Sequence, residues 1–271
     1  MTGRRGRGAL IGLVVALALL IGVGLGVRAL YRAVTAKSIV SQCVTGNFSV
    51  ENDQASVASR MVAVVLKRGL PERAAVLAIA AALQESKLRN LSGGDRDSVG
   101  ILQQRPSQGW GTVEQIMDIS YATGKFLDRV VKVPNWQNSD LADTIQAVQI
   151  SADGSEYAKH EPLAQALADA LTGVTPAGLN CTFSSESQEK SSAAEVVAQL
   201  TADLPVTAPQ INGQTLTVPG ASWPTAEWLV GNAQRLGIAT VSYAGKKWNP
   251  KDGWRTDTSA PSTQVTATVA I

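Results

Sequence analysis

Two runs stand out in the pattern of apolar and polar positions along the chain. The first, residues 9–27, is 19 residues without a charge. As a helix it is about 28 Å long, close to the hydrocarbon thickness of a bilayer. The second, residues 74–83, is apolar on all sides, and a helix of that kind belongs in the middle of a core. This second run ends in the polar sequence Gln84-Glu85-Ser86-Lys87.

The remaining periodicity predicts a series of shorter elements. Asp53 is placed to cap a helix that runs to about Arg68, with Gly69 just past its end. Pro71 and Glu72 suit the first turn of the next helix, which contains the second apolar run. Further helices are predicted over residues 112–117, 121–131, 141–150, 162–171, 193–202 and 225–236, strands over 215–218, 239–243 and 264–270, and a loop over 90–98.

These elements predict how the chain is organised. The expected segments are a cytoplasmic N-terminus (1–8), a transmembrane helix (9–27), a stalk (28–42), a helical domain (43–181), a linker (182–192) and an α+β domain (193–271). The linker is assigned because its sequence SSESQEKSS is polar throughout. The expected fold class is a mainly α domain, preceded by one transmembrane helix and followed by a small α+β domain.

Positive charge sets the expected orientation of the apolar run. Arg4, Arg5 and Arg7 precede it and no acidic residue does, which predicts that the N-terminus is cytoplasmic. The expected localisation is the cell membrane, as a single-pass protein whose C-terminal domains are extracytoplasmic. The alternative is a cleaved signal peptide, for which Val34-Thr35-Ala36 is a poor cleavage site.

The formal net charge of +2 is carried by the N-terminal segment. Without the five arginines that precede Lys37, the chain has 19 basic and 22 acidic residues. The folded part is therefore slightly acidic, and no basic face that would bind nucleic acid is evident. Nucleic acid is accordingly not among the expected partners.

The chain contains two cysteines, Cys43 and Cys181, at the two ends of the predicted helical domain. Both follow the predicted transmembrane helix, where oxidation is allowed. This placement predicts one disulfide that closes the domain, and two buried free thiols are the alternative. Two cysteines and one histidine, His160, do not make a typical zinc site. No metal or cofactor is expected.

Glu85 is the leading candidate for a catalytic residue. It follows a strongly helical, largely apolar segment and precedes a polar loop, which places a carboxyl at the edge of a core. Partial burial raises the pKa of a carboxyl, as a general acid working near neutral pH requires. The alternative is an ordinary solvated glutamate near a helix end, paired with Lys87 or Arg89.

Around Glu85 the chain has a Glu-Ser pair at a predicted helix end, Gly-Asp-Arg at residues 94–96, and a short stretch ending in Gln103. This combination resembles the soluble lytic transglycosylase and goose-type lysozyme superfamily. In that family a Glu-Ser pair ends a buried helix, as Glu85 and Ser86 do here. A Gly-Asp-Arg loop follows, matched at residues 94–96, and then a glycine-plus-hydrophobic stretch that ends in Gln103. The resemblance runs from the second helix to near Cys181, and it implies a lysozyme-like fold for the helical domain.

The resemblance implies cleavage of the β-1,4 bond between N-acetylmuramic acid and N-acetylglucosamine in peptidoglycan, with Glu85 as general acid. A lytic transglycosylase needs this one acid/base, because the N-acetyl group of the substrate assists and an anhydro sugar forms. A hydrolytic lysozyme needs a second carboxylate, for which Asp95 and Asp97 are the candidates. Loop-capping aspartates are the alternative role for these two. The transglycosylase outcome is the favoured one.

The resemblance also implies residues that bind substrate or support the acid. Ser86 would orient Glu85, and Tyr157 would match a tyrosine that faces the acid in transglycosylases. Gln103 would contact the substrate or support its loop. Gln104 and Trp110 are further candidates for substrate binding. The chain departs from the family at residues 149–151 (QIS), where an asparagine-bearing pattern is usual.

Residues 103–111 (QQRPSQGWG) and 157–161 (YAKHE) look like signatures of actinobacterial membrane-anchored proteins of this superfamily. Residues 227–248 resemble a small accessory domain of such wall proteins. Peptidoglycan and the membrane are therefore the expected partners. Two other interpretations stay open: a non-catalytic glycan-binding or scaffold protein of the cell envelope, and an accessory factor that opens the wall locally during secretion or conjugation.

Overall fold

The computed structural model describes residues 22, 26–28, 40–150 and 154–270. The chain divides into two compact units, Met1–Ile39 and Val40–Ile271. All of the strands and helices that follow belong to the second unit. The functional residues expected from the sequence, from Glu85 to Tyr157, therefore lie in one folded body.

The helices of the described part lie where the periodicity of apolar positions predicts them. They are α2 (Asn52–Lys67), α3 (Glu72–Ser86), α4 (Val113–Met117), α5 (Ile119–Val130), α6 (Leu141–Gln149), α7 (Glu161–Leu171), α8 (Ala193–Asp203) and α9 (Trp223–Gly231), with short 3-10 helices η1 (Pro106–Gln108), η2 (Gly154–His160) and η3 (Ser185–Ser187). The first of these begins at Asn52 rather than after Asp53, and α9 ends earlier than expected.

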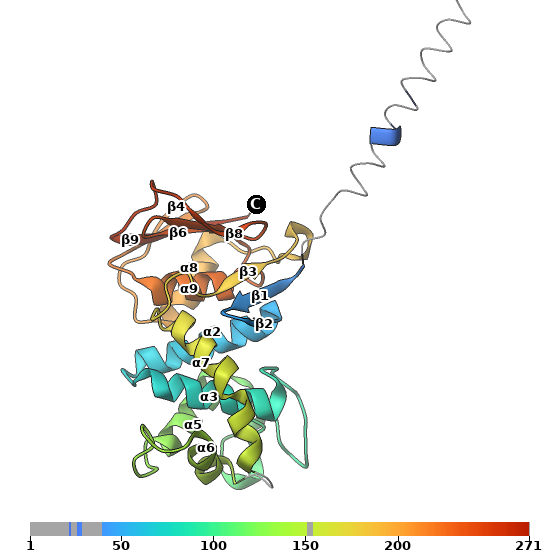
Figure 1. Ribbon diagram of the computed structural model, residues 1–271, viewed down its shortest axis with the longest axis vertical. Helices are drawn as coiled ribbons and strands as arrows, with labels where there is room; N and C mark the ends of the chain where they lie inside the picture. Colours follow the sequence, from blue (N-terminus) through green and yellow to red (C-terminus); the bar gives the residue numbers. More distant parts are fainter. Residues whose placement is uncertain (1–21, 23–25, 29–39, 151–153, 271) are drawn as a thin grey trace, which may run out of the picture. The chain divides into compact units, whose positions relative to one another are not determined.

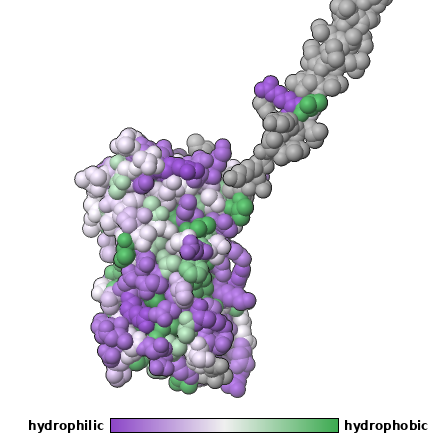
Figure 2. Space-filling view, in the orientation of Figure 1, coloured by the Kyte–Doolittle hydropathy of each residue, from purple (hydrophilic) through white to green (hydrophobic). Residues whose placement is uncertain are grey.

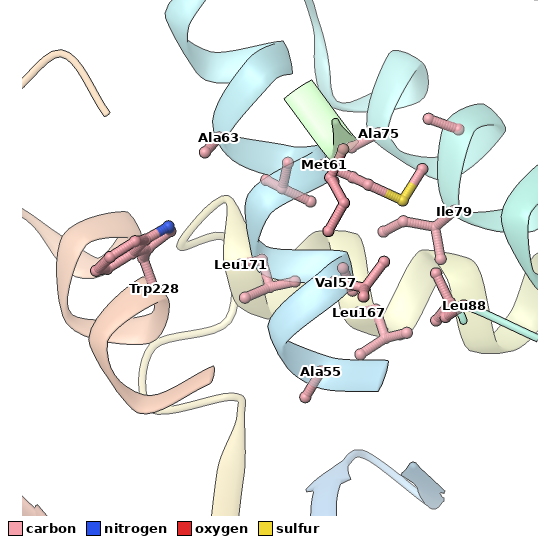
Figure 3. Close-up of a cluster of buried hydrophobic side chains, with 14 of the residues drawn as sticks. Ala55, Val57, Met61, Ala63, Ala75, Ile79, Leu88, Leu167, Leu171 and Trp228 are labelled. Carbon is pink, nitrogen blue, oxygen red and sulfur yellow. The ribbon is translucent and has the colours of Figure 1, made fainter. Parts of the chain in front are cut away.

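Helix α3 is the centre of the helical core. All residues from Ala74 to Leu83 are buried, as expected for a helix that is apolar on every side. Side chains of α2 and α7 pack against it, among them Met61 and Leu167, which are fully buried beside Ile79 (Figure 3). The core therefore encloses α3 until its last turn, where Glu85 is only half-buried.

Two antiparallel sheets are present in the described part. The first has the order β2-β1-β3, formed by Phe48–Val50, Gln42–Thr45 and Asn180–Thr182. The second has six strands in the order β4-β5-β9-β6-β7-β8, formed by Gln210–Asn212, Thr215–Pro219, Gln264–Val269, Ile238–Tyr243, Lys246–Asn249 and Gly253–Thr256. Every pairing in it is antiparallel.

The six-stranded sheet packs on the helices through α9. This helix contacts β6 and β9 and also contacts α2 and α7. Its Trp228 is buried and lies next to α2 (Figure 3). Within this unit the sheet lies at one end and α5 and α6 lie at the other (Figure 1). The helical residues and the sheet thus share one hydrophobic core.

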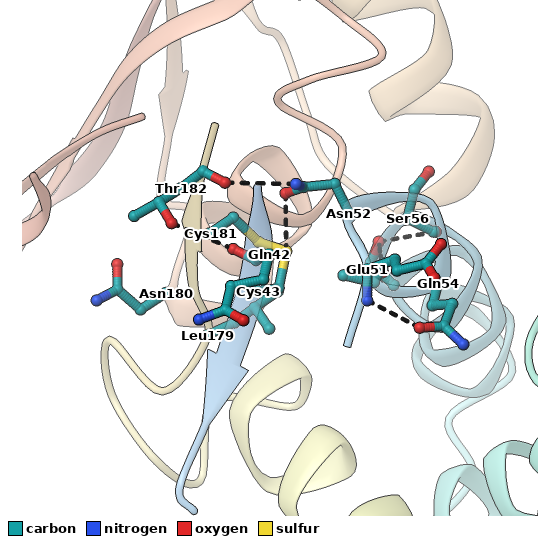
Figure 4. Close-up of a disulfide and its surroundings, with 12 residues drawn as sticks. Gln42, Cys43, Glu51, Asn52, Gln54, Ser56, Leu179, Asn180, Cys181 and Thr182 are labelled. Carbon is teal, nitrogen blue, oxygen red and sulfur yellow. Dashed lines mark hydrogen bonds between the residues drawn. A yellow bond between two sulfur atoms is a disulfide. The ribbon is translucent and has the colours of Figure 1, made fainter. Parts of the chain in front are cut away.

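A disulfide joins Cys43 to Cys181, as the sequence predicts. The two cysteines are directly opposite in the pairing of β1 with β3, and both are fully buried. Asn52 at the start of α2 donates hydrogen bonds to Ser41 Oγ at 2.9 Å and to the Thr182 carbonyl at 3.4 Å (Figure 4). The bridge therefore ties together two strands and a helix from distant parts of the chain.

The predicted fold class is wrong. A mainly α lysozyme-like domain followed by a small α+β domain does not describe a structure with a three-stranded and a six-stranded antiparallel sheet. The sequence pattern does not predict strands β4, β7 and β8. Their sequences (QIN, KKWN and GWRT) lack a regular alternation of apolar and polar residues. The predicted domain boundaries at residues 182 and 193 stay predictions.

The predicted localisation as a single-pass membrane protein also needs correction. The expected transmembrane helix over 9–27 lies outside the described residues, apart from Gly22, Gly26 and Val27. Among the described residues, no helix has the length and apolar character to cross a membrane. A crossing helix needs about 20 apolar residues, whereas α2 has 16 and includes polar side chains.

The surface of the second unit mixes hydrophilic and hydrophobic residues. On the face shown in Figure 2, hydrophilic residues predominate around α3, α5 and α6. The area around the six-stranded sheet is closer to neutral in hydropathy, in keeping with its threonine-rich strands β5 and β9. On this face, hydrophilic residues are thus more frequent around these helices than around the six-stranded sheet.

Candidate active site

The end of helix α3 presents Glu85 to its surroundings. The helix stops because Lys87 and Leu88 both adopt left-handed backbone conformations, each with φ of 56°. Their N–H groups donate to the carbonyls of Leu83 and Ala82, which closes the last turn. Leu88 is buried and anchors this turn in the core. Glu85 is thereby held on a rigid helix end, next to the loop that follows.

Two side chains from later in the chain hold the Glu85 carboxyl. Tyr157 of η2 donates its hydroxyl hydrogen to Glu85 Oε1 at 2.6 Å, and Gln149 at the end of α6 also hydrogen-bonds this carboxyl. The Gln149 amide donates in addition to the Leu102 carbonyl at 3.0 Å. The carboxyl of Glu85 is therefore fixed from two directions.

Burial raises the pKa of Glu85, and the hydrogen bonds from Tyr157 and Gln149 oppose part of that rise. The reason is that a carboxylate removed from water loses solvation, while donors to it stabilise the charged form. Since the pKa is raised overall, a larger fraction of this carboxyl carries a proton near neutral pH than an exposed glutamate would. This is the property that a general acid requires.

Glu85 lines a cleft with a volume of about 790 Å³. Nine of the twelve residues that line it are polar or charged, so the cleft suits a ligand rich in hydrogen-bonding groups. The lining residues are Glu85, Asp95, Arg96, Ser98, Gln103, Arg105, Gln108, Trp110, Arg129, Val148, Gln149 and Ile150.

Ser86 joins the helix end to the loop that follows it. Its hydroxyl donates to the Ile101 carbonyl at 2.7 Å and accepts from the Arg89 N–H at 3.2 Å. The loop is also braced by two short antiparallel bridges, Leu91 with Gly100 and Val99 with Gln104. Ser86 therefore supports the loop that carries Gln103, and it hydrogen-bonds to Ala82, Ile101 and Arg89 rather than to the Glu85 carboxyl.

Gln103 lines the cleft in a constrained conformation, with φ of 45°. Its side-chain carbonyl accepts from the Ser98 hydroxyl at 3.0 Å, and its amide donates to the Gly100 carbonyl at 3.1 Å. Gly94 lies close beside it: a Cβ there would be 1.7 Å from Gln103 Oε1, so a larger residue would displace the glutamine side chain. The Gly-Asp-Arg loop thus has glycine where the glutamine side chain passes close to the backbone.

The two candidate second carboxylates lie in different environments. Asp97 accepts from Arg105 Nε and the Ser107 N–H, both at 2.8 Å, and from the Ser107 hydroxyl at 3.0 Å. The Arg105 guanidinium and these donors hold the pKa of Asp97 well below its usual range. Asp95 lines the cleft, has a side chain that is 90% exposed, and lies 3.9 Å from Arg96 Nε.

Gln104 and Trp110 lie deeper than expected for substrate-binding residues. Gln104 is 1% exposed, is not among the residues lining the cleft, and donates to the Ala122 carbonyl at 3.1 Å. Trp110 is 4% exposed and does line the cleft. The guanidinium carbon of Arg129 lies 3.4 Å from the centre of its ring, so a cation occupies one face of the indole.

A scan of the chain against models of known protein families and a search of curated proteins both find no match. Among the described residues, no group of three or more His, Cys, Asp or Glu side chains is arranged to hold a metal ion.

The structure brings together most of the residues that the motif singled out and adds two more. One cleft is lined by Glu85, Asp95, Gln103 and Trp110. Tyr157 does not line the cleft but donates a hydrogen bond to Glu85. In the sequence, Gln149 stands out only as a departure from the family pattern. Nothing in the sequence indicates that Arg129 lines the cleft, since it belongs to an amphipathic helix whose polar positions are ordinarily solvated.

Proposed function

We propose that this protein cleaves the glycan strands of peptidoglycan, at the β-1,4 bond between N-acetylmuramic acid and N-acetylglucosamine, as a lytic transglycosylase. One observation carries the proposal: Glu85, a half-buried carboxyl with a raised pKa, is held by Tyr157 and Gln149 at the edge of a polar cleft. The motif around it, which resembles the transglycosylase and goose-type lysozyme superfamily, supports the choice of substrate.

The geometry supports an acid–base role for Glu85. In the protonated form its carboxyl gives its proton to the glycosidic oxygen as the bond to that oxygen breaks. The resulting carboxylate then takes the proton of the sugar hydroxyl that closes the anhydro ring, which restores the acid. Tyr157 and Gln149 keep the carboxyl in place through both steps, because each donates a hydrogen bond to it.

The surroundings of the two aspartates favour the transglycosylase outcome over hydrolysis. Asp97 accepts three hydrogen bonds within its loop and does not line the cleft. Through these hydrogen bonds, the Asp97 side chain stabilises the loop that contains Gln103. Asp95 faces solvent and keeps an ordinary environment, so it lacks the fixed position that a residue activating a water molecule requires.

Digestion of purified peptidoglycan tests the proposal directly. The wild-type protein is expected to release muropeptides with anhydro ends, which mass spectrometry distinguishes from the reducing ends of hydrolysis by the mass of one water. The Asp95→Asn protein is expected to retain most of this activity. Reducing ends together with a large loss in Asp95→Asn would favour a lysozyme, and no cleavage of several peptidoglycan preparations would favour a glycan-binding protein.

Replacing Tyr157 by phenylalanine is expected to move the alkaline limb of the pH–rate profile to higher pH. The tyrosine hydroxyl lowers the pKa of Glu85, so its removal raises that pKa further. The acid form, which donates the proton, then persists to higher pH. The maximal rate should fall as well, since the carboxyl loses one of its two positioning contacts.

Rates measured across neutral and alkaline pH for both proteins check this expectation. The Tyr121→Phe protein is a suitable control, because it loses a tyrosine hydroxyl from a residue that does not line the cleft. An alkaline limb of Tyr157→Phe that coincides with that of the wild type, or moves to lower pH, would contradict the assigned role of the hydroxyl.

A further inference from the structure

Arg129 occupies an unusual position for a cation. It is in the last turn of α5 and lines the same cleft as Glu85. Its guanidinium lies flat enough against Trp110 to place the central carbon 3.4 Å from the ring centre. Trp110 is itself buried, so it forms a rigid platform. Stacking of this kind orients the hydrogen-bonding edge of an arginine and restricts its motion.

The other cations of the cleft already have acidic neighbours. Arg105 donates to Asp97 at 2.8 Å, and Arg96 lies 3.9 Å from Asp95. Arg129, in contrast, forms no ion pair with any residue in the described part of the chain. Burial also lowers its pKa, which reflects the loss of water around the guanidinium. The cleft thus contains an oriented, partly desolvated cation without a counter-ion among the described residues.

We propose that Arg129 is a specificity-determining residue that binds a carboxylate of the ligand in the Glu85 cleft, so that the substrate is an anionic glycan rather than a neutral one. This inference rests on the proposed function and narrows it. A guanidinium presents two parallel N–H donors that match the two oxygens of a carboxylate. Such a ligand would supply the charge partner that Arg129 does not find among the described residues.

The Trp110 ring is a poor alternative site for a stacked sugar. Only 4% of this residue is exposed, and the guanidinium covers one face of the indole. A neutral sugar therefore finds little aromatic surface here. The pair contributes to ligand binding through the charge of Arg129, with Trp110 as the platform that holds it.

Binding measured without turnover tests this proposal. The parent protein carries Glu85→Gln, and calorimetry compares two probes: a tetrasaccharide of alternating N-acetylglucosamine and N-acetylmuramic acid with free lactyl carboxylates, and the neutral N-acetylglucosamine tetramer. Adding Arg129→Gln is expected to lower the affinity for the acidic probe by about 10- to 100-fold. This is the usual contribution of a hydrogen bond to a charged group. Affinity for the neutral probe is expected to stay within about twofold.

Lys125→Gln is the matched control. Lys125 is one turn earlier on α5 and also lies over an aromatic ring, 5.4 Å from the centre of Tyr121, but it does not line the cleft. Its replacement removes the same charge and is expected to leave both affinities unchanged. Arg129→Lys keeps the charge and loses the planar fork, so it is expected to bind the acidic probe better than Arg129→Gln and worse than the parent.

A salt titration of the parent protein adds a measurement that needs no further substitution. Affinity for the acidic probe should fall as ionic strength rises, and affinity for the neutral probe should not. Equal losses for both probes in Arg129→Gln, no loss for either, or no binding of the acidic probe by the parent would overturn the proposal. Selective binding by a protein whose wild type cleaves no glycan would refute the proposed cleavage alone.

Discussion

Replacing Glu85 by glutamine is expected to reduce glycan cleavage by about 10²- to 10⁴-fold, the usual contribution of a positioned general acid. The amide has nearly the same shape as the carboxyl and still accepts the hydrogen bond from Tyr157, so packing at the end of α3 should change little. What it lacks is a proton acidic enough to give to the leaving oxygen. Initial rates of release of soluble fragments from peptidoglycan measure the effect.

Glu114→Gln provides the control for this substitution. Glu114 is an exposed glutamate in the short helix α4 and does not line the cleft. The same change of chemistry there is expected to leave the rate unaltered. Thermal unfolding of the Glu85→Gln protein at the wild-type midpoint would show that its fold is intact. Cleavage by Glu85→Gln at the wild-type rate would remove the central claim of the proposed function.

Removing the disulfide, with alanine at both Cys43 and Cys181, is expected to lower the free energy of unfolding by about 2 to 5 kcal/mol. The bridge spans 138 residues of sequence, and a cross-link across a long loop restricts the unfolded chain strongly. Alanine is preferred to serine at these fully buried positions, because a serine hydroxyl there would need a hydrogen-bond partner. Denaturant unfolding at equilibrium measures the difference.

A reductant separates the loss of the bond from other effects of the two substitutions. It is expected to lower the unfolding midpoint of the wild-type protein towards that of the double variant and to leave the double variant unchanged. Equal midpoints for the wild type and the double variant, both without reductant, would show that this bridge does not stabilise the fold.

The arrangement around Glu85 explains why activity and stability should separate in these experiments. The carboxyl lies at the end of α3, whose preceding residues form the centre of the core. The disulfide joins β1 to β3, which are held to α2 by Asn52. A change at Glu85 removes no buried apolar contact, whereas a change at the cysteines releases a constraint on most of the folded unit.

Much of the helical structure was predictable because helix periodicity is a local property. The apolar segment 74–83 requires burial on every side whatever surrounds it, and the structure buries it fully. The disulfide was likewise predictable, since only two cysteines exist and they stand at the ends of one helical segment. Edge strands such as β4 and β8 lacked this kind of signal, because one or both of their faces are exposed.

The position of a glutamate at the end of a buried helix, and the glycine-bearing loop after it, can both be predicted from the local sequence pattern. Which side chains contact that glutamate depends on the tertiary structure. Tyr157 is 72 residues away in the chain, and its contact with Glu85 depends on how η2 packs against α3. The same holds for Gln149 and for the stacking of Arg129 on Trp110. Periodicity reports which face of an element is buried, whereas the partners of a polar side chain are set by the packing of whole elements, which no local pattern encodes.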